Sequence, residues 1–376
     1  LEYTGEFKDV EITSNGSTLV INVKEAPEYS GGLTFGAGYD SDIGGFGAVG
    51  LTLKNAFGNN TEIGGNLLVS KEVQTLRARI RSNDFWLGKY KGGVRLSFEK
   101  YEFENTLYDF QAAQIEPYVV FDLNEKALIE LRYTLASKDI SNIDPSASPI
   151  LLSEAGREVS SGIGFSLATG SSLLDIENAA LDAWSIRFDQ DFTGLGGDTN
   201  LSHTKLSVFA RKQLSSSGFA LRTRLELGAV HGLSDDTPRA SERFTLGGAS
   251  LRGFARGTIS PRDACSGCGA DGGDINTILG GDYYAVLRTD LLVPIFTQRP
   301  ELETFVFFDV GSVWGISTNV AAGGNLLDSR SFNQSAGIGA SFDTKLGKFE
   351  SYIALSTDGG SLDEEQSFGL TFRSEF

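Results

Sequence analysis

The chain has 376 residues, which would suit two or three soluble domains or one β-barrel whose strands each need about ten residues to cross a bilayer. With 46 glycines, 8 prolines, 11% aromatic residues and a mean hydropathy of −0.11, the composition favours many short strands joined by tight turns. The longest apolar stretch, Leu291 to Phe296, is far shorter than the roughly 18 residues of a transmembrane helix, which excludes a helical membrane protein. A net charge of −17 argues against a nucleic-acid partner, because phosphate binding requires clustered cations.

Residues 1–28 differ in pattern from the rest of the chain. The stretch TGEFKDVEIT is typical of a helix end, and NGSTLVINVKEAP predicts a hairpin that turns at Asn15-Gly16. Pro27 closes this segment, so we expect a short remnant of a soluble domain at 1–28 and a second unit at 29–376. The chain has no methionine and begins with neither a basic n-region nor an apolar h-region, which predicts a processed or trimmed chain.

From Gly31 onward, segments of about ten residues carry apolar side chains at every second position and are separated by Gly, Asn, Asp and Ser. In one such segment the apolar face is Leu76, Ala78 and Ile80, and the other face is Arg77, Arg79 and Arg81. A soluble β-sandwich also alternates, with its polar face in water. Here the strands are long and numerous and their polar faces carry both signs of charge, which favours a barrel with an ionic, water-filled lumen.

Aromatic residues near the strand ends indicate the two interfacial girdles of a membrane barrel. They are Tyr39, Trp86, Tyr90, Phe188, Tyr283, Phe296 and Trp314. Because lipid cannot satisfy the free N–H and C=O groups of an open edge, the sheet must close. We therefore predict an all-β fold, a sixteen-stranded antiparallel transmembrane β-barrel. The predicted strands are 33–39, 45–53, 61–70, 73–83, 90–100, 109–123, 127–136, 157–168, 180–191, 203–213, 217–232, 281–294, 303–315, 332–343, 348–357 and 366–376.

One interval interrupts this pattern more than any other. Between Gly247 and Gly280 more than thirty residues show no strand pattern, whereas the interruptions near 137–156 and 316–331 are milder. A loop of that length without secondary structure is normally functional or disordered.

The start of this interval carries a family resemblance. Leu251-Arg252-Gly253-Phe254 resembles the hydrophobic-Arg-Gly-aromatic loop signature of the BamA family of outer-membrane assembly factors. The segments that resemble the family in the same order are GGDY, VFFDVGSVWG, SFNQSAGIGASF and EEQSFGLTFRSEF, and DFTGLGGDTN is similar to the alphaproteobacterial branch. The resemblance covers nearly the whole chain. It implies that 1–28 is the remnant of the last soluble periplasmic POTRA module and that the long loop folds back into the lumen of the barrel.

The same resemblance implies an ion-pair lock between this loop and the inner wall. In the family the loop arginine pairs with acids on the wall, which implies that Arg252 pairs with Asp290 and Asp309. Alternation supports a lumen-facing Asp290, but it supports Asp309 only weakly, because Phe305 and Phe307 share its face. The alternative is that Arg252 is an ordinary solvated surface charge.

The two residues after the arginine complete the predicted lock. Gly253 allows a tight backbone turn that a Cβ would obstruct, and Phe254 could anchor the tip of the loop in an apolar niche. A simple turn glycine next to a buried aromatic residue would leave the same pattern.

The first and last predicted strands would meet at the seam, where the barrel closes. Gly36 and Gly38 weaken strand pairing at one edge, and the last strand carries Phe372 and Phe376 on one face. By resemblance to the family, this seam is a lateral gate whose free strand edge templates an incoming strand by β-augmentation. The chain has no GxxxxGK[ST] loop, so the sequence implies no ATP.

The two cysteines, Cys265 and Cys268, lie in the long loop, and a local disulfide is the expected outcome in an oxidising compartment. The two histidines, His203 and His231, are too few for a structural metal site and have no evident carboxylate partner by spacing. We therefore expect neither a cofactor nor a metal nor an enzymatic activity.

The family resemblance implies the central subunit of the machinery that folds and inserts outer-membrane β-barrel proteins. The implied partners are nascent outer-membrane β-barrel proteins, accessory assembly lipoproteins, periplasmic chaperones and outer-membrane lipid, and no nucleic acid. A passive porin is the alternative from another class. A TamA-like autotransporter assembly factor or a two-partner-secretion pore would belong to the same superfamily but have a different function.

Overall fold

The computed structural model is almost entirely β-structure, and its one described α-helix, α2 (Pro149–Ser153), is a single turn. The described residues are 7–15, 18–25, 30–57, 60–85, 90–102, 106–171, 182–267, 273–296, 298–299, 302–344, 347–356 and 362–374. Within these ranges no helix is both long enough and apolar enough to span a membrane.

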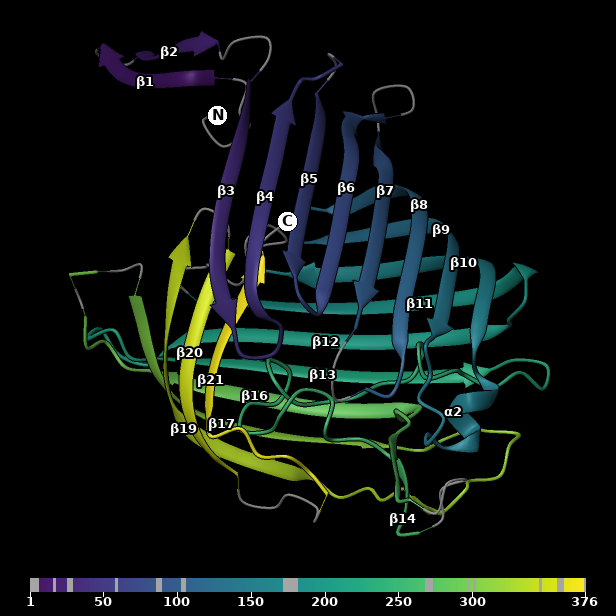
Figure 1. Ribbon diagram of the computed structural model, residues 1–376. Helices are drawn as coiled ribbons and strands as arrows, with labels where there is room; N and C mark the ends of the chain where they lie inside the picture. The colour runs from purple at the N-terminus through teal and green to yellow at the C-terminus, as the bar shows by residue number, and fades with distance from the viewer. Residues whose placement is uncertain are drawn as a thin grey trace.

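Sixteen strands form one antiparallel sheet that wraps into a barrel (Figure 1). They are β3 (Ser30–Asp40), β4 (Gly44–Lys54), β5 (Thr61–Ser70), β6 (Val73–Asp84), β7 (Tyr90–Tyr101), β8 (Asp109–Asn124), β9 (Ala127–Ser141), β10 (Gly156–Gly170), β11 (Ala183–Gly197), β12 (Leu201–Gln213), β13 (Ala220–Gly232), β16 (Tyr283–Leu292), β17 (Leu302–Trp314), β19 (Asn333–Thr344), β20 (Gly347–Ser356) and β21 (Phe368–Ser374). Each strand pairs with its neighbour along the chain, and β3 and β21 are the two end strands of the sheet. The predicted sixteen-stranded antiparallel barrel is confirmed.

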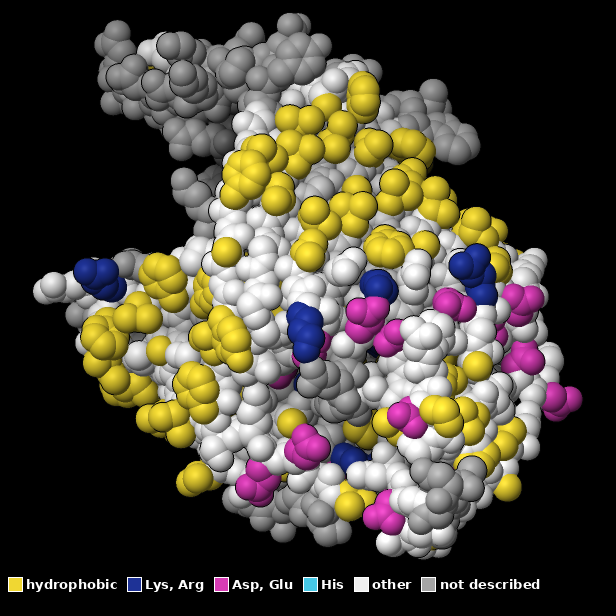
Figure 2. Space-filling view, in the orientation of Figure 1, with side chains coloured by type: hydrophobic (Ala, Val, Ile, Leu, Met, Phe, Trp, Pro, Cys, Tyr) yellow, Lys and Arg dark blue, Asp and Glu magenta, His cyan; other side chains and the backbone are white. Residues whose placement is uncertain are grey.

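The alternation of apolar and polar side chains seen in the sequence separates an apolar outer face of the barrel from an ionic inner face. In β9, Leu131 and Leu135 are 46% and 43% exposed on the outside, whereas Glu130, directly before Leu131, is 7% exposed and faces the lumen. Figure 2 shows hydrophobic side chains gathered over the outer faces of the strands near β3 to β7, with charged side chains closer to the end that carries the long loops. In a bilayer this arrangement places apolar side chains in lipid, and the backbone N–H and C=O groups of neighbouring strands pair with one another within the sheet.

Two strands end several residues later than predicted. β9 continues to Ser141 and β11 continues to Gly197, because β10 between them is long enough to pair with both. Gly196 and Gly197 pair with Ser161 and Ser160 of β10, next to a β-bulge, so a glycine-rich stretch that resembles a turn is built into the sheet.

A separate two-stranded hairpin precedes the barrel. It consists of β1 (Phe7–Asn15) and β2 (Thr18–Glu25), and it lies beyond the end of the barrel where β3 begins (Figure 1). Asn15 pairs with Thr18, which agrees with the predicted hairpin, and Gly16 lies outside the described residues. The expected helix end is wrong for residues 7–13, which belong to β1 because they pair with β2.

We call the end of the barrel where β3 begins the hairpin rim, and the end that carries α2 the loop rim.

The long segment between β13 and β16 lies at the loop rim and is not without structure. It contains β14 (Arg262–Cys265) and β15 (Ile275–Ile278), which form a three-stranded sheet with β18 (Asn325–Leu327) from the next long connection. The expectation of no strands between Gly247 and Gly280 is therefore wrong. Strands of four residues are too short to show alternation in a sequence.

Candidate functional site

The tip of the long segment is packed inside the barrel. Leu251, Arg252 and Phe254 are each 0% exposed. Leu251 and Phe254 belong to an apolar cluster that includes Val286 of β16 and Val313 of β17 on the inner wall. The chain at residues 251–254 is thus a part of the core of the barrel and not a solvated loop.

Gly253 supplies the backbone turn at this tip. Its φ is +91°, a conformation that side-chain-bearing residues rarely adopt. A Cβ placed on Gly253 would lie 2.8 Å from Cβ of Ser335 in β19. The oxygen of the neighbouring Arg252 accepts a hydrogen bond from Oγ of Ser335, so the wall holds the turn closely.

Arg252 forms ion pairs with three acids of the inner wall. Its Nε and Nη2 donate to the two carboxylate oxygens of Asp309, each at 2.7 Å, and Nη2 also donates to Asp290 at 2.7 Å. Nη1 donates to Glu350 of β20 at 3.2 Å. The bidentate contact with Asp309 fixes both the direction and the position of the guanidinium group of Arg252.

The inward-facing aromatic residues beside Asp309 contact the same guanidinium. Arg252 Cζ lies 3.8 Å from the ring centre of Phe307 and 5.4 Å from that of Phe305. Phe305 and Phe307 are each 2% exposed, so they face the lumen together with Asp309 and not the lipid. A cation above an aromatic face is attracted by the ring electrons, and the attraction grows when water is excluded.

The charges around Arg252 outweigh the cost of burying it. Burial alone would lower the pKa of Arg252, but Asp309, Asp290 and Glu350 together raise it above its ordinary value. The network extends along the wall, because Arg222 of β13 pairs with Asp290 at 2.9 Å and Arg288 of β16 pairs with Glu350 at 3.4 Å. The acids that receive Arg252 are thus held in place by cations of their own.

The seam between β3 and β21 is closed at the loop rim by a few hydrogen bonds. The N–H of Ser41 donates to the oxygen of Leu370 at 2.7 Å, and the N–H of Phe372 donates to the carboxylate of Asp40 at 2.7 Å. Within the described residues no ladder pairs β3 with β21. The closure therefore relies on side chains and one turn.

Aromatic stacking supports this seam from the side. Phe372 of β21 packs on Phe46 of β4 and on Phe349 of β20, with ring centres 4.8 Å apart in both pairs. Phe349 shares its face of β20 with the exposed Ile353, the outer face, whereas Phe46 is buried on the inner face of β4. Consequently the inner face of β4 lies against the outer face of β20 and β21, and the two edges overlap.

The predicted gate glycines lie in β3 within this seam. A Cβ on Gly38 would come within 2.7 Å of the Phe46 ring and 3.1 Å of the Phe349 ring, so glycine allows the overlap. Gly36 pairs with Ala48 of β4. Phe376 lies outside the described residues.

The tip of the long segment is hydrogen-bonded to both sides of the seam. On one side, the N–H of Ala249 donates to Asp42 at 3.2 Å, in the turn that follows β3. On the other side, the N–H of Gln366 donates to the oxygen of Gly253 at 3.0 Å, and the N–H of Ala255 donates to the oxygen of Glu364 at 2.8 Å, just before β21. The lock and the seam are therefore one connected structure.

Comparison with known proteins agrees with this architecture. A family model described as the Omp85 superfamily domain matches residues 55–376. The chain belongs to the Omp85 superfamily.

The curated relative found is the outer membrane protein assembly factor BamA of Neorickettsia risticii, which is 22% identical over 373 residues. The match covers 97% of this chain and 48% of that protein, so the chain spans about half the length of its relative. The BamA structure of Haemophilus ducreyi lacking POTRA domains 1–3 has a TM-score of 0.76 at 18% identity, covering 98% of this chain and 75% of that one. CdiB of Acinetobacter baumannii has a TM-score of 0.56 at 13% identity, covering 97% and 64%.

These matches confirm the resemblance to the BamA family and the barrel fold predicted from the sequence. With an Omp85 barrel and a bacterial outer-membrane relative, the chain is an integral protein of the bacterial outer membrane, as predicted.

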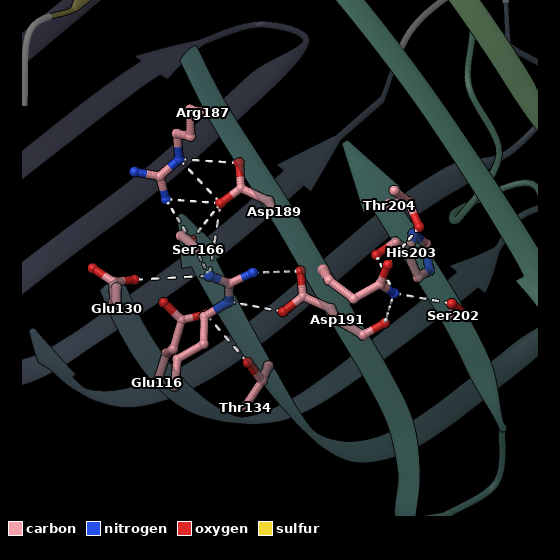
Figure 3. A network of polar contacts seen from close by, with 12 residues as sticks. Glu116, Glu130, Thr134, Ser166, Arg187, Asp189, Asp191, Ser202, His203 and Thr204 are labelled. Atoms are coloured by element: carbon pink, nitrogen blue, oxygen red, sulfur yellow. Dashed lines mark hydrogen bonds and ion pairs between the residues drawn. The ribbon is translucent and has the colours of Figure 1, made fainter. Parts of the chain in front are cut away.

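A second ionic network of the Omp85 barrel covers the wall from β8 to β12 (Figure 3). Arg132 of β9 donates to the two oxygens of Asp191 in β11, at 2.7 and 2.6 Å, and to Ser166 of β10. Glu116 and Asp189 lie in the same network. A cavity of about 550 Å³ is lined by this wall and by residues 241–244 of the long segment. The lumen of the barrel is thus ionic and partly open on this side.

Some residues of the site were not found by sequence reasoning. Glu350 and Asp42 contact the lock and the segment that carries it, yet neither belongs to a motif. The alternation of β20, in which Lys348 and Tyr352 face inward with Glu350, could have placed Glu350 on the inner wall.

The predicted disulfide falls partly outside the described residues. Cys265 at the end of β14 is disulfide-bonded. Cys268 lies outside the described residues, so the pairing of Cys265 with Cys268 stays a prediction. Among the described residues no cluster of His, Cys, Asp and Glu could hold a metal ion.

Proposed function

We propose that the chain is the barrel domain of an outer-membrane protein assembly factor, which folds and inserts β-barrel proteins through a lateral gate between β3 and β21. The observation that carries the proposal is the seam, where the two end strands of a sixteen-stranded sheet meet, over the residues that the structure describes, through Ser41 and Asp40 instead of a ladder. Similarity to BamA of Neorickettsia risticii, an assembly factor by name, supports the same role.

The energy for insertion comes from backbone pairing. When the seam opens, β3 and β21 offer free N–H and C=O groups, and an incoming strand can add to such an edge by β-augmentation. Each hydrogen bond formed in lipid replaces an unsatisfied polar group, which costs several kcal/mol there. The reaction needs neither a bound nucleotide nor a catalytic side chain, so the proposed role is not enzymatic.

In this mechanism the long segment keeps the gate closed. Arg252 holds the tip on the wall, and the same tip bonds to the turn after β3 and to the residues before β21. Releasing Arg252 from Asp290 and Asp309 would loosen both edges of the seam together. The lock therefore couples the lumen of the barrel to its lateral opening.

The partners follow from this role. The substrates are nascent outer-membrane β-barrel proteins, delivered by periplasmic chaperones, and the surrounding outer-membrane lipid accepts the product. Residues 1–28 are proposed as the remnant of the last POTRA module, and 29–376 as the barrel. Accessory assembly lipoproteins would bind the soluble modules of the whole protein.

A cross-seam disulfide tests the gate in the full-length protein. Ser41→Cys and Leu370→Cys replace two residues that are hydrogen-bonded across the seam, and oxidation should stop insertion of barrel substrates until a reductant is added. Ala210→Cys with Thr223→Cys is the matched control, because these residues already pair in the β12–β13 ladder.

Normal insertion by the oxidised seam variant would overturn the lateral gate. A wild-type protein that inserts no substrate but conducts ions steadily in planar bilayers would instead favour the porin. A partner polypeptide secreted without insertion would favour a two-partner-secretion or TamA-like task.

A further inference from the structure

The base of the long segment is tied to a different part of the wall from its tip. The carboxylate of Glu242 lies 2.6 Å from Nζ of Lys138 in β9 and 3.1 Å from Nε2 of His203 in β12. The Glu242 side chain is 9% exposed. A buried carboxylate that faces two basic groups from two strands is fixed in position as well as neutralised.

The next residue closes the neck of the segment. Arg243 has a fully buried side chain that pairs with Glu154, and its Nη1 donates to the oxygen of Leu279 at 2.7 Å. The backbone of Phe244 pairs with that of Gly281, just before β16. The start and the end of the segment are therefore held together, and the direction in which the chain leaves the neck is set at residues 242–244.

Two of the attachments of the segment to the inner wall are thus ionic clusters, one on β9 and β12 through Glu242 and one on β16, β17 and β20 through Arg252. The two residues are ten positions apart in the chain. Beside the base lies the cavity of about 550 Å³, lined by Lys138, His203 and Glu242, so a released base has space to move. Movement of the base would shift the start of the short stretch that carries Arg252 to its acids.

We propose that Glu242 is a positioning residue for the lock: its ion pairs with Lys138 and His203 fix the base of the segment so that Arg252 meets Asp309 and Asp290. The inference rests on the proposed function, in which the lock controls the gate. The segment is then a strap across the lumen, held at its base by Glu242 and at its tip by Arg252.

The test compares Glu242→Gln with Glu125→Gln in the full-length protein in detergent micelles. Gln keeps the size of the side chain and removes its charge, and Glu125 is an exposed residue of the β8–β9 turn. Trypsin cleavage after Arg252 and Arg256 reports release of the strap, because cleavage follows the population of the open form. We expect cleavage in Glu242→Gln to be about tenfold faster than in wild type, as for the loss of one charged hydrogen bond. Glu125→Gln should be cut at the wild-type rate.

The following results distinguish the positioning role from a merely structural role of Glu242. The electrophoretic shift between folded and heat-unfolded barrel should be unchanged in Glu242→Gln, because the strands of the barrel remain paired. Lys138→Gln should also speed cleavage, but less than Glu242→Gln, because His203 still contacts Glu242. The double variant should be cut no faster than Glu242→Gln, since the pair between Lys138 and Glu242 is already broken there. Additive effects, or cleavage within the barrel strands, would overturn the positioning role.

The outcomes also separate this inference from the proposed function. Trypsin reports the strap without any substrate protein. A strap that stays protected in Glu242→Gln refutes the positioning role and leaves the gate proposal intact. A released strap with normal substrate insertion would support the positioning of Arg252 and count against the lock as a control of insertion.

Discussion

Replacing Arg252 by alanine should weaken the barrel and impair assembly, because it leaves acids buried without their cation. Asp309 is 0% exposed, and among the described residues the cation left beside it would be Arg288, whose Nε lies 3.7 Å away. Asp290 would keep Arg222 at 2.9 Å. Asp309 is therefore the acid that loses most of its charge compensation in Arg252→Ala.

The expected cost follows from this geometry. Breaking a buried ion pair by removing one partner costs about 3–5 kcal/mol, mainly because a charge stays buried without compensation. Loss of the contact with the Phe307 ring at 3.8 Å adds about 0.5–2 kcal/mol. If the orphaned carboxylate dominates, Asp309→Ala added to Arg252→Ala should recover roughly half of the loss.

Urea unfolding in detergent, followed by electrophoretic mobility, measures the stability of both variants, and growth of cells that depend on the gene measures assembly. The reasoning fails if Arg252→Ala unfolds at the wild-type urea concentration. It fails in part if the double variant is less stable than Arg252→Ala, because the orphaned acid would then not be the cause. Normal growth of the Arg252→Ala cells would remove the lock from the assembly mechanism.

Two further variants probe the same segment. Gly253→Ala should destabilise the barrel by about 1–3 kcal/mol in the same urea assay, since φ is +91° and the new Cβ would lie 2.8 Å from that of Ser335, whereas Ala255→Gly should have little effect. Burial alone would raise the pKa of Glu242, but Lys138 and His203 outweigh it and lower this pKa from 4.5 to about 2. The stabilisation is thus complete above pH 4.5 and is lost as the pH falls toward about 2, and Glu242→Gln should flatten this part of the stability curve.

The strands could be predicted because a barrel wall imposes one local rule. Each strand must place apolar side chains in lipid and polar ones in the lumen, so a period of two repeats sixteen times along the chain. Errors occurred where the rule does not apply, at β14 and β15, which lie in the long segment at the loop rim and have four residues each. The ends of β9 and β11 were missed because their length depends on pairing with β10 and not on their own sequence.

The site could be predicted only as far as a motif identifies it. Arg252, Asp290 and Asp309 lie together, and the family resemblance named all three. Glu350 was missed because it reaches Arg252 from β20, far away in the sequence, and an acid on an inner wall has no signal that distinguishes it from other lumen-facing acids. Glu242 was missed because its partners, Lys138 and His203, lie on strands that are distant in the sequence. Such contacts depend on the course of the loop through the lumen.

Phe305 and Phe307 illustrate how a departure from alternation can still be informative. They made the inward direction of Asp309 doubtful, because an ionic, water-filled lumen does not favour aromatic side chains. In the structure the lumen at this point is filled by the tip of the segment, and Phe307 packs against Arg252 and Tyr352 away from water. An aromatic residue on the inner face of a barrel strand therefore indicates where the lumen is occupied. Two such residues on one strand, followed by an acid at the next inward position, mark a wall that receives a cation from inside the barrel.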